Sequence, residues 1–209
     1  MNVYDFDNTL YDGESGLHLF LFYLKKRPSL VRYTPQVLRG VADYKRGRVT
    51  FDQAIGRVSG ILQPVLRDVE DYRADAREFW DKHEHRLRPF YRRLHRPDDL
   101  IISASPEQLL REACARLGVN HFIGSVIDES TGLLEFACFR ENKVKAFRER
   151  YPGQQIDSFY TDSMNDKPLM DIARRVFMVS RREIVQIKGE GSAPRGYAPD
   201  MAPLAGMQL

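Results

Sequence analysis

Two aspartates one residue apart follow directly on a short apolar segment, and this feature constrains the fold more than any other. Residues 3–9 read Val-Tyr-Asp-Phe-Asp-Asn-Thr, and their apolar members suit a buried strand. Burial of the Asp5 and Asp7 carboxylates is unfavourable unless a cation or a reacting group compensates them. Open α/β sheets bind their ligands at the carboxyl ends of the strands. The segment therefore predicts a strand over residues 2–7 that ends in a functional site.

Three later segments also place polar side chains at the end of an apolar run or at the start of a helix. They carry Ser103, Lys143, and the pair Asp162 and Asp166. Together with the first segment they give, in order, the motifs Asp-x-Asp-x-Thr, Ser, Lys and Asp-(x)3-Asp. This order resembles the haloacid dehalogenase (HAD) superfamily of phosphotransferases, over roughly residues 1–188.

The resemblance implies an α/β fold in which helices flank a HAD-like Rossmannoid parallel sheet, with an all-helical cap inserted after the first strand. The pattern along the chain agrees, because the region 12–97 contains no convincing strand and strands alternate with helices after it. We therefore expect a catalytic core at 1–11 and 98–188, a cap at 12–97, and a disordered tail at 189–209. The closest subgroup by resemblance is the phosphoserine phosphatase-like branch.

Apolar periodicity and turn residues give the expected elements in more detail. The cap pattern predicts helices at 15–26, 35–45 and 51–62, a long amphipathic helix after Pro64, and a short one at 89–95. In the core we expect strands at 100–103, 156–161 and 176–179, helices at 106–117, 142–150 and 166–174, and a hairpin-like pair at 126–128 and 133–137.

The resemblance assigns phosphoryl chemistry to the first two aspartates. Asp5 is the predicted nucleophile, since a carboxylate can attack phosphorus to give an aspartyl-phosphate. Asp7 would protonate the leaving oxygen and then accept a proton from water. The dehalogenases of the superfamily lack an acid at this position, because halide leaves without a proton. The alternative interpretation is a simple turn capped by Asp-Asn-Thr.

A magnesium site is implied by the same resemblance. Its protein ligands would be Asp5, the backbone carbonyl of Asp7, and Asp162, and oxygen ligands of these kinds suit Mg²⁺. The ion would neutralise nucleophile and phosphate so that one anion can approach the other. Asp166 would support the site by holding a metal-bound water or orienting Lys143, or it would serve only as a helix cap.

Phosphate contacts are expected from Ser103, the first hydroxyl after its apolar run, and from Lys143. We choose Ser103 over Ser105 because of its place in the motif, and Lys143 because it lies five residues after Cys138, as in related phosphatases. Glu14 has two open interpretations. It would bind substrate, as a glutamate does nine residues after the nucleophile of phosphoserine phosphatases, or it would favour a helix dipole.

Composition narrows the partners and the location. The net charge of +3 is small for 209 residues, so we expect no nucleic-acid binding. Residues 25–96 hold 18 of the 32 Lys and Arg but only 9 of the 29 Asp and Glu, and membrane contact of this basic segment is considered but not favoured. Two cysteines, no long apolar run and a first motif at residue 5 lead us to expect a cytoplasmic protein without a signal peptide.

The predicted function is Mg²⁺-dependent hydrolysis of a small phosphorylated metabolite through an aspartyl-phosphate. Three alternatives remain open at this stage: a phosphotransferase or mutase with the same residues, a lipid-phosphate phosphatase, and a regulatory module with a vestigial site. The sequence determines neither the substrate nor the oligomeric state.

Overall fold

The computed structural model describes residues 1–181 and 183–190, which contain a single seven-stranded sheet of order β4-β3-β2-β1-β5-β6-β7. The strands are β1 (Asn2–Tyr4), β2 (Leu100–Pro106), β3 (His121–Ile127), β4 (Leu134–Phe136), β5 (Ser158–Thr161), β6 (Arg175–Val179) and β7 (Ile184–Lys188). The five central strands are parallel, and only the edge strands β4 and β7 run antiparallel to their neighbours. The predicted α/β class is confirmed.

Alternation of side chains along the central strands gives the sheet two buried faces. Val3 belongs to one apolar cluster and its neighbour Tyr4 to the other. In β2, Leu100 and Ile102 join the cluster of Val3, whereas Ile101 joins that of Tyr4. Because successive residues of a strand point to opposite faces, a continuous apolar run serves both cores.

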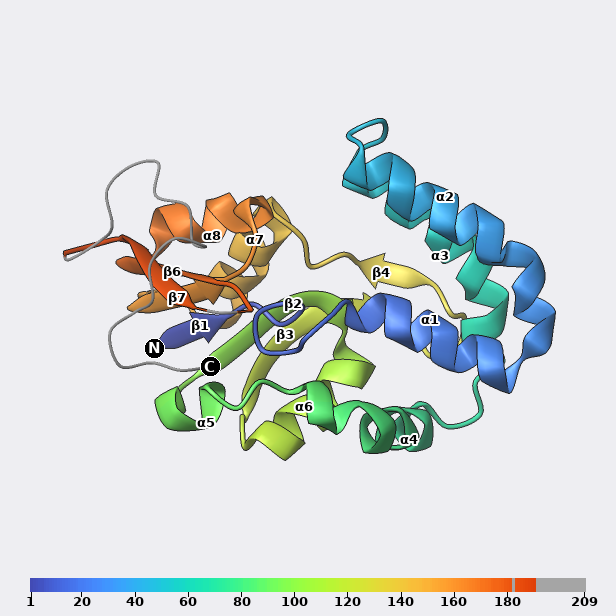
Figure 1. Ribbon diagram of the computed structural model, residues 1–209, viewed down its shortest axis with the longest axis horizontal. Helices are drawn as coiled ribbons and strands as arrows, with labels where there is room; N and C mark the ends of the chain where they lie inside the picture. Colours follow the sequence, from blue (N-terminus) through green and yellow to red (C-terminus); the bar gives the residue numbers. More distant parts are fainter. Residues whose placement is uncertain (182, 191–209) are drawn as a thin grey trace.

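Helices cover both faces of the sheet (Figure 1). One layer holds α7 (Glu141–Arg150) and α8 (Lys167–Ile172), and the other holds α4 (Tyr72–His83), α5 (Tyr91–Leu94) and α6 (Glu107–Leu117). Local capping marks several ends. Asp71 accepts bonds from two backbone N–H groups at the start of α4, and Gly118 ends α6 in the left-handed region at φ +73°, which favours glycine.

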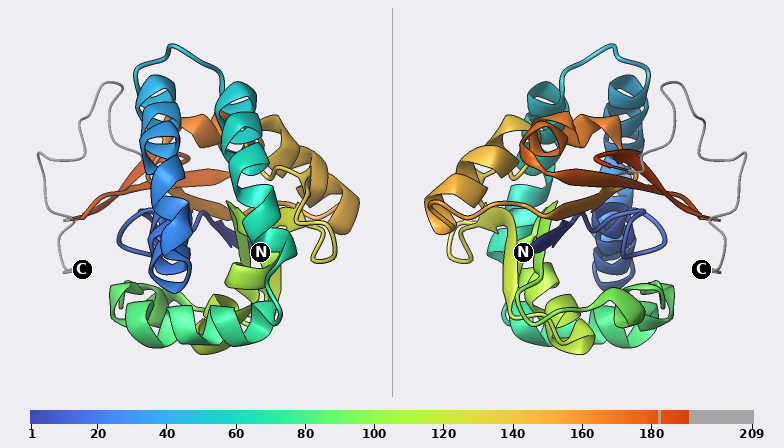
Figure 2. Two further views of the ribbon diagram at one scale, coloured as in Figure 1. Left: turned by 90° about the vertical axis from the view of Figure 1, so that its right-hand side faces the viewer. Right: turned by 90° about the vertical axis from the view of Figure 1, so that its left-hand side faces the viewer.

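The remaining helices, between β1 and α4, project beyond the ends of the strands. They are α1 (Ser15–Lys26), the 3-10 helix η1 (Pro28–Tyr33), α2 (Thr34–Lys45) and α3 (Phe51–Arg67). Figure 2 shows α2 and α3 side by side, joined by the turn at 46–50. A capping box between Thr50 and Gln53 starts α3. This arrangement is consistent with a helical cap.

The predicted break at Pro64 is wrong, because α3 continues through Pro64 to Arg67. Proline inside a helix removes one hydrogen bond and is disfavoured but not forbidden. The chain turns instead at 68–71, where the side chain of Asp71 caps α4. Strand β7 was not predicted either. It pairs antiparallel with β6 at the edge of the sheet, where a short strand gives a weak pattern.

The boundary between core and cap stays a prediction, but one contact bears on it. Trp80 of α4 is fully buried, and its indole N–H donates to the Leu109 carbonyl of α6 at 2.9 Å. Helix α4 therefore packs with the core layer, which favours a cap that ends near Arg67. The expected tail at 189–209 lies almost entirely outside the described residues. Within the described part of the chain, no helix has the length and apolar character needed to cross a bilayer.

Candidate active site

The carboxyl end of β1 brings Asp5 against a lysine and an aspartate from distant parts of the chain. The Asp5 backbone N–H donates to the Tyr160 carbonyl at 2.9 Å, which continues the pairing of β1 with β5. Lys143, in the first turn of α7, places Nζ 2.8 Å from Asp5 Oδ1 and 2.7 Å from Asp166 Oδ1. All three side chains are buried. One lysine thus joins two of the predicted site carboxylates.

Burial controls the ionisation of this group. Desolvation alone would lower the pKa of Lys143, but Asp5 and Asp166 raise it above its ordinary value, so the lysine stays charged. Burial raises the pKa of Asp5 well above its ordinary value, opposed by Lys143 and reinforced by Asp166 and Asp162. The site therefore holds more carboxylates than its single ammonium group can compensate.

The loop after β5 supplies the second pair of carboxylates. Thr161 Oγ1 donates to Asp166 Oδ2 at 2.8 Å, and Thr9 Oγ1 lies 3.5 Å from Asp162 Oδ1. Asp166 stands at the N-cap of α8, yet its side chain makes no capping hydrogen bond. Its carboxylate faces Lys143 instead, so the cap-only interpretation of Asp166 has no geometric support.

Asp7 lies apart from the lysine group and has its own donors. Its Oδ1 accepts the Ser15 backbone N–H at 2.9 Å, and its Oδ2 accepts the Ser105 hydroxyl at 3.1 Å. Burial raises the pKa of Asp7 to about 6, although the bonds from Ser15 and Ser105 oppose this shift and Glu14 adds to it. A carboxyl that titrates near neutral pH can both give and take a proton.

A tight turn directly after Asp7 returns the chain towards α1. Asn8 adopts φ +57°, a left-handed conformation that asparagine tolerates better than most residues. The backbone N–H groups of Leu10 and Tyr11 both donate to the Phe6 carbonyl, at 2.8 and 2.9 Å. This turn leads the chain round to Ser15, whose N–H meets Asp7.

The remaining predicted residues differ in exposure. Ser103 is buried, and its Oγ accepts the Ser105 backbone N–H at 3.1 Å. Glu14 is exposed, and its Oε1 accepts from Asn8 Nδ2 at 3.2 Å. It is the N-cap residue of α1 but makes no side-chain capping bond. Lys145, the lysine not chosen, is exposed.

Two residues in contact with Asp7 were missed from the sequence. Ser15 was treated only as the start of a helix, and Ser105 only as a competitor of Ser103 for phosphate. The sequence did contain a signal for Ser105, because a hydroxyl two residues after a strand-end serine points to the same side of an extended chain. The pairing of Ser105 with Asp7 over 98 residues could not be read without the fold.

The donor set fits a divalent cation. Desolvation raises the pKa of Asp162 to about 6, with contributions from Asp166 and Glu14, while Lys143 opposes them. An oxygen-binding cation would compensate Asp5 and Asp162 together. Within the described residues no three acidic, His or Cys side chains are arranged to hold a metal by themselves. The predicted set needs only two carboxylates, because a backbone carbonyl and waters complete it.

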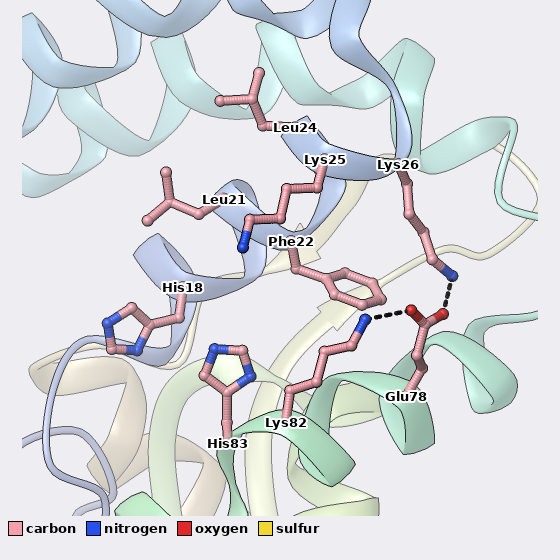
Figure 3. A pocket seen from close by; sticks show the side chains of 9 residues that line it. All are labelled: His18, Leu21, Phe22, Leu24, Lys25, Lys26, Glu78, Lys82 and His83. Atoms are coloured by element: carbon pink, nitrogen blue, oxygen red, sulfur yellow. Dashed lines mark hydrogen bonds and ion pairs between the residues drawn. The ribbon is translucent and has the colours of Figure 1, made fainter.

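A cavity of about 510 Å³ lies away from these residues, between α1 and α4 (Figure 3). Its lining is mostly apolar and basic and contains none of the predicted site residues. The lining residues are His18, Leu21, Phe22, Leu24, Lys25, Lys26, Glu78, Lys82 and His83. Glu78 pairs with Lys26 and with Lys82 at 2.6 Å each, but this one carboxylate offsets only one of the three lysine charges in the lining. The candidate active site therefore lies at the carboxyl ends of the central strands and not in this cavity.

The chain matches a known protein family over most of its length. The family described as haloacid dehalogenase-like hydrolase matches residues 3–171. That span contains every predicted site residue, from Asp5 to Asp166. Among curated proteins, none matches the chain.

Solved structures share the fold at low sequence identity. A Bordetella pertussis Tohama I protein of unknown function has a TM-score of 0.69 and 22% identity, over 84% of this chain and 87% of its own. A phosphoserine phosphohydrolase-like protein from Francisella tularensis has a TM-score of 0.57 and 17% identity, over 84% and 86%. A structure described as a phospho-aspartyl intermediate analogue of phosphoserine phosphatase gives 0.51 and 15%, over 83% of each chain.

Proposed function

Because this chain belongs to the haloacid dehalogenase-like hydrolases, we propose that it is a Mg²⁺-dependent phosphatase that cleaves phosphomonoesters through an aspartyl-phosphate on Asp5. The observation that carries the proposal is the buried contact of Lys143 with Asp5 and Asp166 at the carboxyl end of β1. Asp7, two residues on, presents a second carboxylate with its own donors.

Each residue has a distinct part in the proposed reaction. Asp5 attacks phosphorus while Asp7 gives its proton to the leaving oxygen. Asp7 then takes a proton from the water that attacks the aspartyl-phosphate, which regenerates both carboxyl groups. Lys143 stabilises negative charge on the transferring phosphoryl group. Ser103 contributes its hydroxyl hydrogen to a phosphate oxygen, since its Oγ already accepts from Ser105.

A bound Mg²⁺ would supply charge compensation for nucleophile and phosphate. Its ligands would be Asp5, Asp162 and the Asp7 carbonyl. The excess of buried carboxylates favours binding of a cation there. Asp166 would keep Lys143 in place, through the 2.7 Å contact between them.

We propose a small phosphorylated metabolite as substrate and the cytoplasm as the location, both of which stay predictions. Helices α1 to α3 project over the carboxyl end of the sheet, where they would enclose a small leaving group. Glu14 lies at the start of α1, close enough to Asp7 and Asp162 to raise the pKa of both. Its carboxylate is the best candidate to bind a substrate amine.

The test is release of inorganic phosphate by the purified protein from a panel of phosphorylated metabolites, with lipid phosphates included. We expect turnover of at least one soluble ester, together with an acid-stable phosphoenzyme on Asp5. Transfer of the phosphoryl group to an organic acceptor, without free phosphate, would identify a phosphotransferase. No turnover of any ester, generic aryl phosphates included, would leave the regulatory-module interpretation.

Metal dependence gives a second measurement on the same protein. Exhaustive chelation should abolish turnover, Mg²⁺ should restore it, and Ca²⁺ should restore little, because Ca²⁺ tolerates bidentate carboxylates that would tie up Asp5. Asp162→Ala should raise the Mg²⁺ concentration needed for half-maximal activity. Full activity after chelation would contradict the metal assignment.

A further inference from the structure

Two serines outside the predicted site fix the orientation of Asp7. The Ser15 backbone N–H donates to Oδ1 at 2.9 Å, and the Ser105 hydroxyl donates to Oδ2 at 3.1 Å. Ser15 is fully buried, and Ser105 is 4% exposed. One serine begins helix α1 and the other lies near the end of β2. The Asp7 carboxylate is therefore anchored from the cap side and from the sheet at once.

The hydroxyl groups of the two serines are also in contact with each other. Ser15 Oγ and Ser105 Oγ lie 2.6 Å apart, and each hydroxyl has one hydrogen to donate. The Ser105 hydroxyl lies within reach of Asp7 Oδ2, and a hydrogen bond from the Ser15 side chain also lowers the pKa of Asp7. Both serines therefore support the Asp7 carboxylate, and hydrogen bonds that are joined in this way polarise one another.

Ser103 and Ser105 differ in what their hydroxyls are free to do. The Ser103 oxygen accepts the backbone N–H of Ser105 at 3.1 Å, and its own hydrogen has no acceptor in the described part of the chain. The Ser105 hydrogen is already engaged by Asp7. A phosphate oxygen would thus find its donor at Ser103, whereas Ser105 serves the acid.

We propose that Ser105, supported by Ser15, is a positioning residue that aligns Asp7 for proton transfer to the leaving oxygen. The inference rests on the proposed function. As the Asp5–phosphorus bond forms and the ester bond breaks, the Asp7 proton passes to the leaving alcohol. A proton donor must face its acceptor within hydrogen-bond reach, and the Ser105 bond opposes rotation of the carboxyl group away from it. Ser105 itself loses no proton.

Leaving groups of different acidity test this role. A dinitrophenolate leaves without a proton, whereas phenolate needs one, so only phenyl phosphate depends on Asp7 during the first step. We measure kcat/KM, which reports phosphoryl transfer to Asp5 and not the later hydrolysis. Ser105→Ala should lower kcat/KM about tenfold for phenyl phosphate and less than about twofold for dinitrophenyl phosphate. Asp7→Asn should show the same selectivity with a larger loss.

Matched variants separate positioning from phosphate binding and from folding. Ser103→Ala should lower kcat/KM equally for both esters, because both carry the same phosphate. Ser15→Ala keeps its N–H bond to Asp7 and should give a smaller selective loss, and it serves if Ser105→Ala does not fold. Equal losses for both esters in the Ser105 and Ser15 variants, or no loss, would overturn this inference alone. A wild-type protein inactive on both esters would overturn the proposed function as well.

Discussion

Polar side chains are paired differently at the carboxyl ends of the central strands, called the edge below, and on the helices α1 to α3. At the edge, pairs are buried and join residues far apart in sequence, such as Lys143 with Asp5. On the helices the ion pairs are partly exposed, as where Lys26 meets Asp75 and Glu78. Exposed pairs contribute little to stability, whereas a buried group depends on every partner. Substitutions at the edge should therefore abolish catalytic activity, and substitutions on the helices should change activity or selectivity by smaller amounts.

The largest effect is expected from Asp5→Asn, which should lower kcat by more than about 10⁴-fold because an amide cannot act as the nucleophile. The fold should survive, and the thermal midpoint should stay equal or rise, because burial, together with Asp166 and Asp162, disfavours the Asp5 carboxylate more than Lys143 stabilises it. Phosphate release and thermal melting check the two parts.

The exposed Asp171 gives the matched control, since its side chain pairs with Lys167 on the surface of α8. Asp171→Asn should leave both activity and melting unchanged. Retained activity in folded Asp5→Asn would place the nucleophile elsewhere and remove the contrast between edge and cap.

The second effect concerns selectivity and lies on the cap side. Glu14→Gln keeps an acceptor for Asn8 Nδ2 but removes the negative charge. If Glu14 binds a substrate amine, kcat/KM for phosphoserine and phosphoethanolamine should fall about tenfold, and that for phenyl phosphate less than about twofold. Steady-state kinetics with the three esters decide. Equal losses would reduce Glu14 to a helix-dipole role and leave the cap without a known specificity residue.

The third effect probes a contact between α3 and the turn that joins β3 to β4. Gly132, in the turn between β3 and β4, has φ +70°, and a Cβ there would overlap the Gln63 carbonyl oxygen and lie 2.6 Å from Arg67 N. Gln63 Nε2 also donates to the Thr131 carbonyl at 3.4 Å. Gly132→Ala should lower the free energy of unfolding by about 2–3 kcal/mol, because it adds a clash to backbone strain.

Gly153 supplies the control for backbone strain alone. Its φ is +75°, and a Cβ there would meet no atom within 4 Å. Gly153→Ala should cost only about 1 kcal/mol. Denaturant unfolding of both variants measures the difference, which is the cost of the clash with α3. Equal losses would mean that α3 does not rest on this turn in solution.

Prediction from the sequence succeeded where one short segment contains both the fold signal and the chemistry. The apolar run before Asp5 predicted a strand that ends at a site, and the resemblance of the motifs implied that Lys143 lies near Asp5, as the 2.8 Å contact between them shows. Prediction failed where a distant partner decides. The helix through Pro64 packs against α2, and the weight given to proline alone misplaced its end.

The same limit explains Ser105. Its neighbour Ser103 is set apart by the local motif, whereas the bond from Ser105 to Asp7 depends on how closely β1 and β2 approach. The register Tyr4 with Ile101 brings the two strand ends together, and one sequence gives no direct measure of that register. Pairs formed across strands therefore need the structure, even when each member is already suspected.

The smallest effect concerns the cavity between α1 and α4, where His18 accepts or donates a 2.5 Å hydrogen bond with the Tyr11 hydroxyl. Burial lowers the pKa of His18 below 6.5, with contributions from Arg86 and His83, while Glu14 and Asp12 oppose the shift. The unfolded chain then binds more protons than the folded protein just below pH 6.5.

Stability from neutral His18 is therefore complete above about pH 6.5 and declines as the pH falls from there towards the lower folded pKa. The side chain is partly exposed, so the loss should stay below about 1 kcal/mol. His18→Gln removes the titration, and the difference between its thermal midpoint and that of the wild type should shift in its favour between about pH 8 and pH 5. A difference that is constant with pH would show that His18 is as solvated in the folded protein as in the unfolded chain. Helix α1 would then pack less closely against α4 than the buried site residues pack against one another.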